Sequence, residues 1–215
     1  MAKWKRAKAI AAVTMASAMV MTTPVWAAEE YDLNNPPIAE TEAGQIRGFM
    51  NEGTYTFLGV PYAQAERFQA PQKVEAWEGV RNAQSYGTIC PIQNQTSVGS
   101  DEFVWPHRYW VQNEDCMNLN VWTQSLDTEA KKPVIVFFHG GGYTNGSSVE
   151  SAAYDGKNLS EYGDAVVVTV NHRLNVLGFM DLSDYGDEYA DSANLGIQDL
   201  VASLQWVQDN IANFG

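Results

Sequence analysis

The sequence predicts an α/β protein whose core is a mostly parallel sheet crossed by helices. Two short apolar runs, Val134–Phe138 and residues 165–170, consist largely of β-branched and aromatic residues. Such continuous runs are typical of strands buried on both faces of a parallel sheet. A short helical segment separates the two runs, and a longer amphipathic helix follows over residues 195–213. This order of strand, loop, helix and strand is typical of parallel strands joined by crossover helices.

The first of these strands ends in a loop of almost bare backbone. His139, Gly140, Gly141 and Gly142 follow Phe138 without a spacer. Consecutive glycines can adopt positive φ and leave their N–H groups uncovered by side chains. Because α/β proteins bind ligands at the carboxyl ends of their parallel strands, this loop is the first candidate for a ligand site.

A dinucleotide-binding loop is the alternative for these glycines, and the sequence argues against it. Residues 140–145 have glycine at the first and third places of the G-x-G-x-x-G pattern, but Asn145 stands at the sixth. The next strand ends at Asn171, where a dinucleotide fold would need an acidic residue to hold the ribose. We therefore expect no nucleotide cofactor at this loop.

The chain before the loop divides into an ordered part and an irregular one. Residues 38–60 alternate short apolar segments with glycines, which predicts a small antiparallel meander at one edge of the domain. Residues 61–115 show no sustained period of apolar residues. They form either an irregular region that faces the substrate or simply an irregular part of the surface. A strand is expected around Leu119 to Trp122, and a short helix over residues 157–162.

The helix near the end of the sequence has a clear period. Apolar residues recur at spacings of three and four, which places them on one face of the helix. They are Ile197, Leu200, Val201, Leu204, Val207 and Ile211. Ser192 or Asn194 is expected to cap the N-terminus of this helix.

The first 27 residues have the pattern of an export signal. A basic segment over residues 3–8 precedes an apolar stretch over 9–21 that is too short to span a bilayer. Small residues before Ala27 suit cleavage after that position, although a membrane anchor is the alternative. The sequence predicts a signal peptide over residues 1–27, a secreted or periplasmic protein, and a mature chain over residues 28–215.

The mature chain is strongly acidic. The sequence has 13 basic and 26 acidic residues, and four of the basic ones lie in the signal segment, which leaves a formal charge of about −17. A surface of this sign repels nucleic acid and anionic membranes, so neither is an expected partner.

Two cysteines, Cys90 and Cys116, are the only ones in the sequence. In an exported protein an isolated pair is most simply a disulfide, although a buried free pair or a metal site are alternatives. The sequence has no Cys-x-x-Cys motif, and its three histidines show no metal-ligand spacing. We therefore expect no metal site.

Several stretches together resemble the type-B carboxylesterase family, which includes cholinesterases and bacterial para-nitrobenzyl esterases. They occur in the family's order and cover nearly all of residues 38–215. The stretches are FLGVPYA at 57–63, Arg67-Phe68, EDCMNLNVW at 114–122, FFHGGGY at 137–143, YDGKNL at 154–159, VNHRLNVLGF at 170–179 and NLGIQDLVASLQWVQDNIANFG at 194–215. Departures from the family pattern, such as Met117 in place of leucine, are mild and leave the substrate preference open.

The resemblance implies an α/β-hydrolase fold, with a small antiparallel N-terminal sheet leading into a mostly parallel central sheet. It also implies hydrolysis of a small-molecule ester by a Ser–Glu/Asp–His triad, without a metal or organic cofactor. Gly141 and Gly142 would then donate two N–H groups to the oxyanion, as HGGG-type loops do in lipases and esterases. His139 would shape the loop rather than act as the base.

The resemblance further implies three structural links outside the loop. Cys90 and Cys116 would form a disulfide. Arg67 would pair with Glu114, and Arg173 with Asp199, as ion pairs that fix geometry rather than add much stability. Four unrelated surface charges are the alternative for the two ion pairs.

The nucleophile of such an enzyme is missing from these 215 residues. In the family the serine lies in a G-x-S-x-G elbow that follows a helix like 195–213, and no serine here has glycine two residues before and two after it. Ser147 comes nearest to that pattern. We therefore expect the N-terminal fragment of a longer serine esterase, inactive by itself. The alternative is a catalytically inactive, esterase-like binding or adhesion protein, and a serine in the elbow would distinguish the two.

Overall fold

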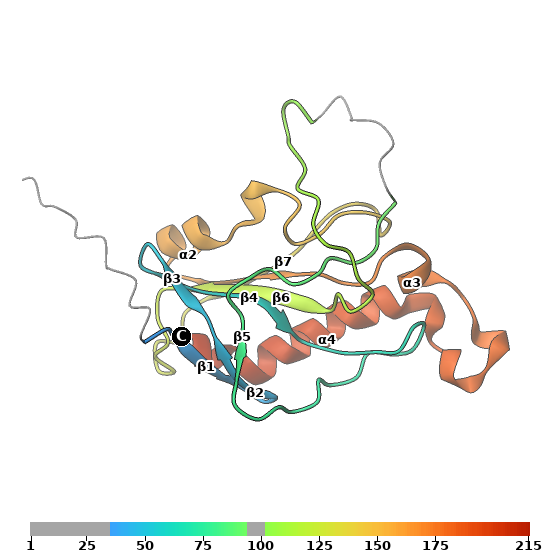
Figure 1. The fold of residues 1–215 in the computed structure, drawn as a ribbon, viewed down its shortest axis with the longest axis horizontal. Coiled ribbons are helices and arrows are strands. Elements are labelled where there is room, and N and C mark those ends of the chain that lie inside the picture. The colour runs from blue at the N-terminus through green and yellow to red at the C-terminus, as the bar shows by residue number, and fades with distance from the viewer. Residues whose placement is uncertain (1–34, 94–101) are drawn as a thin grey trace, which may run out of the picture. The chain divides into compact units, whose positions relative to one another are not determined.

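The computed structural model describes residues 35–93 and 102–215 (Figure 1). The predicted signal peptide, residues 1–27, lies outside the described residues. Among the residues that are described, no helix is both long and apolar enough to cross a membrane.

A five-stranded sheet in the order β3-β4-β6-β8-β7 forms the core. Its strands are β3 (Phe49–Asn51), β4 (Thr54–Pro61), β6 (Asn118–Thr123), β7 (Val134–Phe138) and β8 (Val166–Val170). β7 and β8 run parallel, and the three other neighbouring pairs are antiparallel. The described sheet is therefore mixed, where the sequence predicted a mostly parallel one.

The connections between strands explain this mixture. Parallel neighbours need a long crossover, and β7 is joined to β8 by one that contains helix α2 (Lys157–Gly163). The tight turn at Glu52 and Gly53, both at positive φ, joins β3 to β4 and permits antiparallel pairing only. The predicted strand–loop–helix–strand unit is thus confirmed, and it is the part of the described sheet that is parallel.

The predicted N-terminal meander is present, but two sheets share it. β1 (Ile38–Thr41) and β2 (Gly44–Arg47) form an antiparallel pair that β5 (Val80–Asn82) extends in parallel. β3 and β4 belong to the central sheet instead. The chain passes between the sheets at Gly48, where a Cβ would lie 2.4 Å from the carbonyl oxygen of Thr56. A side chain would not fit at this crossing.

β8 and β7 differ in burial although their sequences look alike. All five residues of β8 are buried, as predicted. β7 is an edge strand of the described sheet, and Val134 and Ile135 are each 38% exposed. The prediction that Val134–Phe138 is buried on both faces is therefore wrong in this structure, because none of the five residues of β7 is fully buried.

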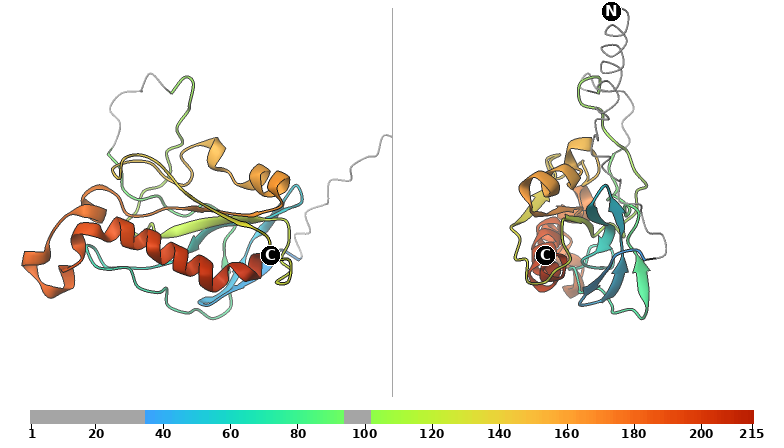
Figure 2. Two further views of the ribbon diagram at one scale, coloured as in Figure 1. Left: turned by 180° about the vertical axis from the view of Figure 1, so that it is seen from behind. Right: turned by 90° about the vertical axis from the view of Figure 1, so that its left-hand side faces the viewer.

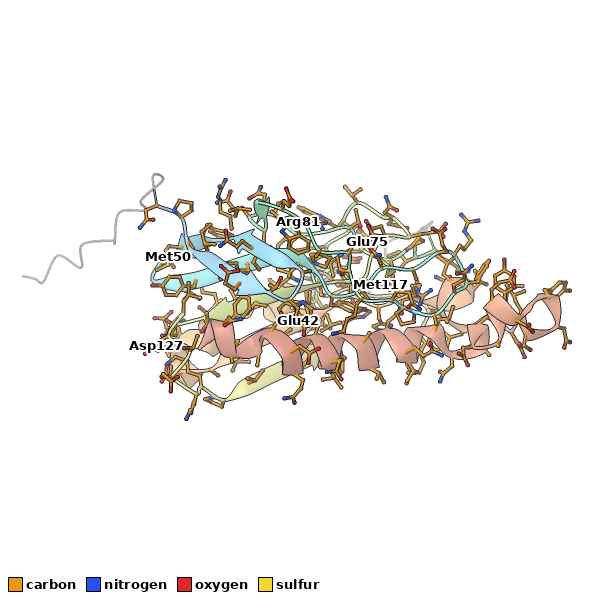
Figure 3. The ribbon with its side chains drawn as sticks, turned by 90° about the horizontal axis from the view of Figure 1, so that it is seen from below. Glu42, Met50, Glu75, Arg81, Met117 and Asp127 are labelled. Carbon is orange, nitrogen blue, oxygen red and sulfur yellow. A yellow bond between two sulfur atoms is a disulfide. The ribbon has the colours of Figure 1, made fainter. Side chains whose placement is uncertain are left out.

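Helices α2 and α4 (Leu195–Asn210) lie on opposite faces of the central sheet (Figures 1 and 2). A short helix α3 (Asn175–Phe179) precedes α4. The 3₁₀ turns are η1 (Ala152–Tyr154), η2 (Ser183–Tyr185), η3 (Asp187–Tyr189), η4 (Ser192–Asn194) and η5 (Ile211–Phe214). The turn between β1 and β2 lies beside α4, where the Glu42 N–H donates to Asn210 Oδ1 at 2.7 Å (Figure 3).

The buried face of α4 differs from the predicted apolar face. Leu200, Val207 and Ile211 pack against the core as expected, but Val201 and Leu204 are 62% and 46% exposed. The buried face is instead formed by Leu195, Gly196, Asp199, Ser203, Trp206 and Asn210. Its polar members each have a hydrogen-bond partner, which offsets the cost of burying them. Periodicity of apolar residues alone does not detect such a face.

The two residues considered as the cap of this helix have different roles. Asn194 is the N-cap residue, but its side chain makes no capping hydrogen bond. Ser192 accepts a hydrogen bond from the Leu182 N–H at 2.7 Å and so fixes the preceding loop.

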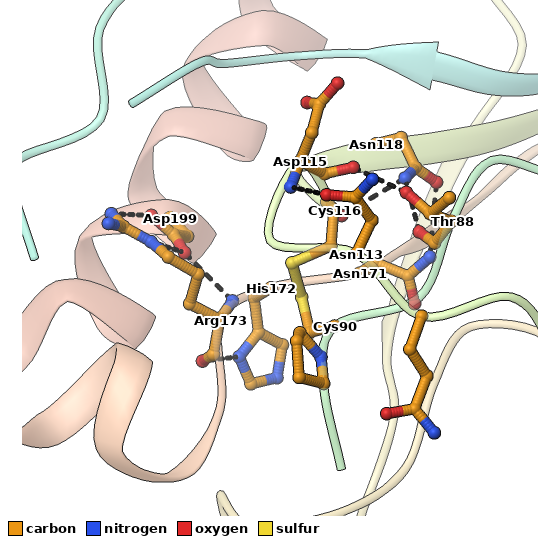
Figure 4. Close-up of a disulfide and its surroundings, with 12 residues drawn as sticks. Thr88, Cys90, Asn113, Asp115, Cys116, Asn118, Asn171, His172, Arg173 and Asp199 are labelled. Atoms are coloured by element: carbon orange, nitrogen blue, oxygen red, sulfur yellow. Dashed lines mark hydrogen bonds and ion pairs between the residues drawn. A yellow bond between two sulfur atoms is a disulfide. The ribbon is translucent and has the colours of Figure 1, made fainter. Parts of the chain in front are cut away.

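The predicted disulfide between Cys90 and Cys116 is present (Figure 4). It ties the irregular region that precedes β6 to the start of that strand, and it packs against Leu174 and Ile92. Among the described residues, no cysteine is free.

Replacing both Cys90 and Cys116 with alanine is expected to lower the free energy of unfolding by roughly 3–4 kcal/mol, because the bond closes a loop of this length in the unfolded chain. Chemical denaturation of the two proteins measures the difference. Thiol titration of the unfolded, unreduced protein should find no free thiol. Two titratable thiols in protein recovered from an oxidising compartment would contradict the disulfide.

Candidate active site

The glycine loop follows directly from the carboxyl end of β7. His139 is buried, whereas Gly140, Gly141 and Gly142 are exposed. Gly141 has φ +122° and Gly142 has φ +62°. A Cβ on Gly141 would lie 2.0 Å from the carbonyl oxygen of Asn145, so the loop geometry requires glycine there.

The loop folds back on the carbonyl group of Gly141 and leaves the N–H groups of Gly141 and Gly142 without a partner in the described part of the chain. The carbonyl oxygen of Gly141 accepts hydrogen bonds from the N–H groups of Thr144 and Asn145, both at 3.2 Å, and from Thr144 Oγ1 at 3.1 Å. Within the described residues, neither the Gly141 N–H nor the Gly142 N–H has a hydrogen-bond acceptor. Two successive exposed donors are therefore available to an oxygen-bearing ligand.

Two stacked histidines lie at the base of this loop. The rings of His139 and His172 are 4.8 Å apart between centroids and nearly parallel. His139 Nδ1 lies 2.8 Å from the Gly140 carbonyl oxygen, and His172 Nδ1 lies 3.1 Å from that of Arg173. Because a carbonyl oxygen only accepts, each Nδ1 carries the hydrogen.

Burial keeps both rings neutral. It lowers the pKa of His139 to about 4 and also lowers the pKa of His172. A neutral, stacked imidazole whose Nδ1–H is committed to the loop's own backbone supports the loop. The structural role expected for His139 stays a prediction.

The pKa of His139 predicts a loss of stability in mild acid. Between about pH 4 and 6.5, His139 is protonated in the unfolded chain, where its pKa is near 6.5, but stays neutral in the folded protein. The free energy of unfolding therefore has its full value above pH 6.5. It decreases by about 3 kcal/mol, for this residue alone, as the pH is lowered towards 4. Urea denaturation at several pH values measures the loss. His139→Gln, which cannot be protonated, should show a shallower dependence, and identical slopes would contradict the assignment.

Both expected ion pairs form, in very different surroundings. Arg173 and Asp199 are buried, with the Arg173 Nε and Nη2 atoms 2.9 and 2.7 Å from the two carboxylate oxygens (Figure 4). The backbone N–H of Arg173 also donates to Asp199, at 2.9 Å. Arg67 and Glu114 form a similar two-bond pair at the surface, where the Arg67 side chain is 63% exposed. The first pair holds α4 to the segment after β8.

Asp199→Ala is expected to destabilise the protein by roughly 3–5 kcal/mol, because it leaves the Arg173 guanidinium buried without its partner. Glu114→Ala removes the partner of the exposed Arg67 and should have a far smaller effect, because water screens that pair. Thermal unfolding of the two variants provides the comparison. Equal losses of stability would contradict the explanation that the two ion pairs differ because one is buried and the other exposed.

Residues that sequence reasoning did not single out complete the site. Asn120, on β6, and Asn171, just after β8, contact Ser148 behind the glycine loop. The Asn175 N–H donates to the Tyr143 carbonyl oxygen at 2.7 Å. A signal was present in the sequence, since asparagines at positions 118 and 120 interrupt an apolar strand on the same face.

A cavity of about 450 Å³ lies away from this loop, between the β1–β2 turn, the end of β4 and α4. Tyr62 and Trp206 contribute aromatic walls, and Lys73 at its edge pairs with Glu42 and Asp209. Its charged groups are already paired with one another. Among the described residues, no group of three or more metal-ligating side chains is assembled. The glycine loop is therefore the better candidate for chemistry.

Comparison with known protein families places the chain in one of them. Residues 35–215 match the model of the carboxylesterase family. The chain belongs to the carboxylesterase family. It is 39% identical over 184 residues to para-nitrobenzyl esterase of Bacillus subtilis and 41% identical over 192 residues to human carboxylesterase 3. Each alignment covers 83% of this carboxylesterase chain, but only 35% and 32% of the respective relative.

Solved structures show the same relationship. An esterase from Clostridium hathewayi that can hydrolyse aliphatic aromatic polyesters aligns with a TM-score of 0.82 and 56% sequence identity, over 86% of this chain and 37% of that one. A structure of para-nitrobenzyl esterase aligns with a TM-score of 0.74 and 35% identity. The predicted α/β-hydrolase fold is thus confirmed for its N-terminal part. This carboxylesterase chain spans about a third of the length of its relatives.

Proposed function

We propose that a protein containing this chain hydrolyses carboxylic esters through a serine acyl-enzyme, and that Gly141 and Gly142 form its oxyanion hole. The observation that carries the proposal is the pair of successive, exposed glycine N–H groups without acceptors at the end of β7. Such donors stabilise the negative charge that develops on a carbonyl oxygen when a nucleophile attacks. Membership in the carboxylesterase family supports ester hydrolysis as the reaction.

The division of roles follows from the residues present. The chain supplies the electrostatic part of the reaction, whereas the serine, its histidine base and the acidic residue lie outside these 215 residues. Ser147 and Ser148 do not replace the nucleophile, because both are buried, Ser147 Oγ accepts a hydrogen bond from the Val149 N–H and the Ser148 N–H donates to Asn171. His139 does not replace the base, because it is buried against His172 and burial lowers its pKa to about 4.

Substrates and location belong to the same proposal. The Clostridium hathewayi relative, 56% identical, can hydrolyse aliphatic aromatic polyesters, so we propose esters with aliphatic and aromatic parts as substrates. We further propose that residues 1–27 are a signal peptide and that the mature domain begins at residue 28. The Cys90–Cys116 disulfide supports an oxidising destination, either secreted or periplasmic.

The test uses the full-length protein that contains this chain. It should hydrolyse a short-chain aryl ester, and an organophosphate should abolish the activity by labelling one serine per chain. Mass spectrometry of the exported protein should find its N-terminus near residue 28. A folded full-length protein that neither turns over aryl esters nor reacts with the organophosphate would favour the binding-protein alternative.

A further inference from the structure

The glycine loop is interlocked with the segment through which it returns to the core, residues 145–148. A Cβ on Gly141 would lie 2.0 Å from the Asn145 carbonyl oxygen, and one on Gly146 would lie 2.3 Å from the Gly140 carbonyl oxygen. The two stretches of backbone are thus in direct contact. A shift of residues 145–148 would carry the glycine N–H groups with it.

Two buried asparagines hold this return segment at Ser148. The Ser148 N–H donates to Asn171 Oδ1 at 2.8 Å. Ser148 Oγ accepts from Asn120 Nδ2 at 3.1 Å. All three residues are at most 2% exposed, so water does not compete for these hydrogen bonds.

Further hydrogen bonds to Asn118 and Tyr62 hold Asn171 in place. Its Nδ2 donates to Asn118 Oδ1 at 3.2 Å, and its backbone N–H donates to the Asn118 carbonyl oxygen at 2.9 Å (Figure 4). Its carbonyl oxygen accepts from the Tyr62 hydroxyl at 2.7 Å. Burial raises the pKa of Tyr62, which keeps this hydroxyl a donor at all ordinary pH values. The position of Asn171 Oδ1 is therefore set by the end of the sheet.

We propose that Asn171 is a positioning residue for the oxyanion hole, acting through Ser148 on the N–H groups of Gly141 and Gly142. The inference rests on the function proposed above. Oxyanion donors work only when they are aimed at the place where charge develops, and a misplacement of about 1 Å can reduce the rate by about 100-fold. Asn171 keeps the two N–H groups pointed in that direction, because its hydrogen bond to Ser148 connects the return segment to the end of strand β8.

The experiment compares Asn171→Ala with Asn118→Ala in the full-length protein. Both variants lose the hydrogen bond between the two asparagines, and Asn118→Ala also loses bonds to the carbonyl oxygens of Thr88 and Cys116. Only Asn171→Ala removes the acceptor for the Ser148 N–H. Asn171→Ala should lower kcat for an aryl ester about 10- to 100-fold with KM within twofold. Asn118→Ala keeps the acceptor for the Ser148 N–H and removes only one of the groups that hold it, so it should lower kcat by a smaller factor than Asn171→Ala does.

A second readout separates positioning from loss of structure. Binding of a trifluoromethyl ketone, which forms a tetrahedral adduct, should weaken in parallel with kcat, whereas binding of the product alcohol, which carries no acyl oxygen, should not change. If Asn171→Ala does not fold, Asn171→Ser replaces it. A serine keeps a small polar side chain at this position but places no oxygen where Asn171 Oδ1 accepts from the Ser148 N–H, so the same kinetic result is expected.

The outcomes distinguish the two proposals. An active parent whose Asn171 variants keep kcat within twofold, or lose no more of it than Asn118→Ala, overturns the positioning role and leaves the proposed function intact. A parent with neither ester turnover nor organophosphate labelling overturns the proposed function, and the role of Asn171 falls with it. A selective loss of kcat and of ketone binding supports both.

Discussion

Gly141→Ala is expected to lower kcat/KM for ester hydrolysis about 100-fold or more in the full-length protein. The new Cβ would lie 2.0 Å from the Asn145 carbonyl oxygen, at a φ of +122° that alanine rarely adopts. The loop must therefore move, and it takes with it the two N–H groups proposed to bind the oxyanion. Losing one such donor typically reduces kcat by 100- to 1,000-fold. Steady-state kinetics with a short-chain aryl ester measures the effect.

Gly53→Ala is the matched control for this substitution. Gly53 also has positive φ, +87°, but it lies in the β3–β4 turn and a Cβ there would meet no atom within 4 Å. It shares the backbone strain of Gly141→Ala without touching the glycine loop, so activity should stay within twofold of the parent. A folded Gly141→Ala protein with activity within threefold of the parent would show that this loop is not the oxyanion hole.

Residues 28–215, produced by themselves, are expected to have no esterase activity and to self-associate. They contain no serine in a nucleophile elbow, and their proposed contribution is limited to two N–H donors. In the described residues the outer edge of β7 is unpaired, with Val134 and Ile135 partly exposed along it. Exposed apolar strand edges of this kind pair with other chains. Size-exclusion chromatography and an aryl-ester assay measure both expectations.

Ile135→Lys should reduce this self-association, because a charged side chain on an edge strand opposes pairing with a second chain. Leu159→Lys places the same charge on an exposed position of α2 and should leave the association unchanged. Turnover by the isolated chain that titrates with an organophosphate would reveal a nucleophile within these residues. In that case Ser147 and Ser148 would be the first positions to substitute.

The position of β7 at an edge was not evident from the sequence, which predicted the same burial for Val134–Phe138 and residues 165–170. In the structure β8 lies between β6 and β7 and is paired on both sides, so of these two strands only β7 has an open edge. Strand order is a property of the tertiary fold, because two apolar runs of the same composition pair equally well in several orders.

The buried polar residues show a second limit of sequence reasoning. Asn120 and Asn171 look like ordinary polar residues at strand positions, yet both are buried and hold the loop at Ser148. Burying an amide is favourable only when every partner is in place, and those partners come from segments more than 20 residues apart. For the same reason, the sequence pattern did not reveal that Asp199 and Asn210 lie on the buried face of α4.

Local patterns in the sequence were enough to predict the class of the fold, the strand that leads into the glycine loop, and a disulfide as the simplest interpretation of the two cysteines. These features are local, since apolar runs, consecutive glycines and an isolated cysteine pair restrict the chain regardless of its surroundings. The three-dimensional arrangement was needed to find that β7 is an edge strand, that α4 buries a partly polar face, and that Asn171 reaches Ser148. Those features depend on which distant segments meet in space, because hydrogen bonds and burial are set by neighbours that local pattern does not specify.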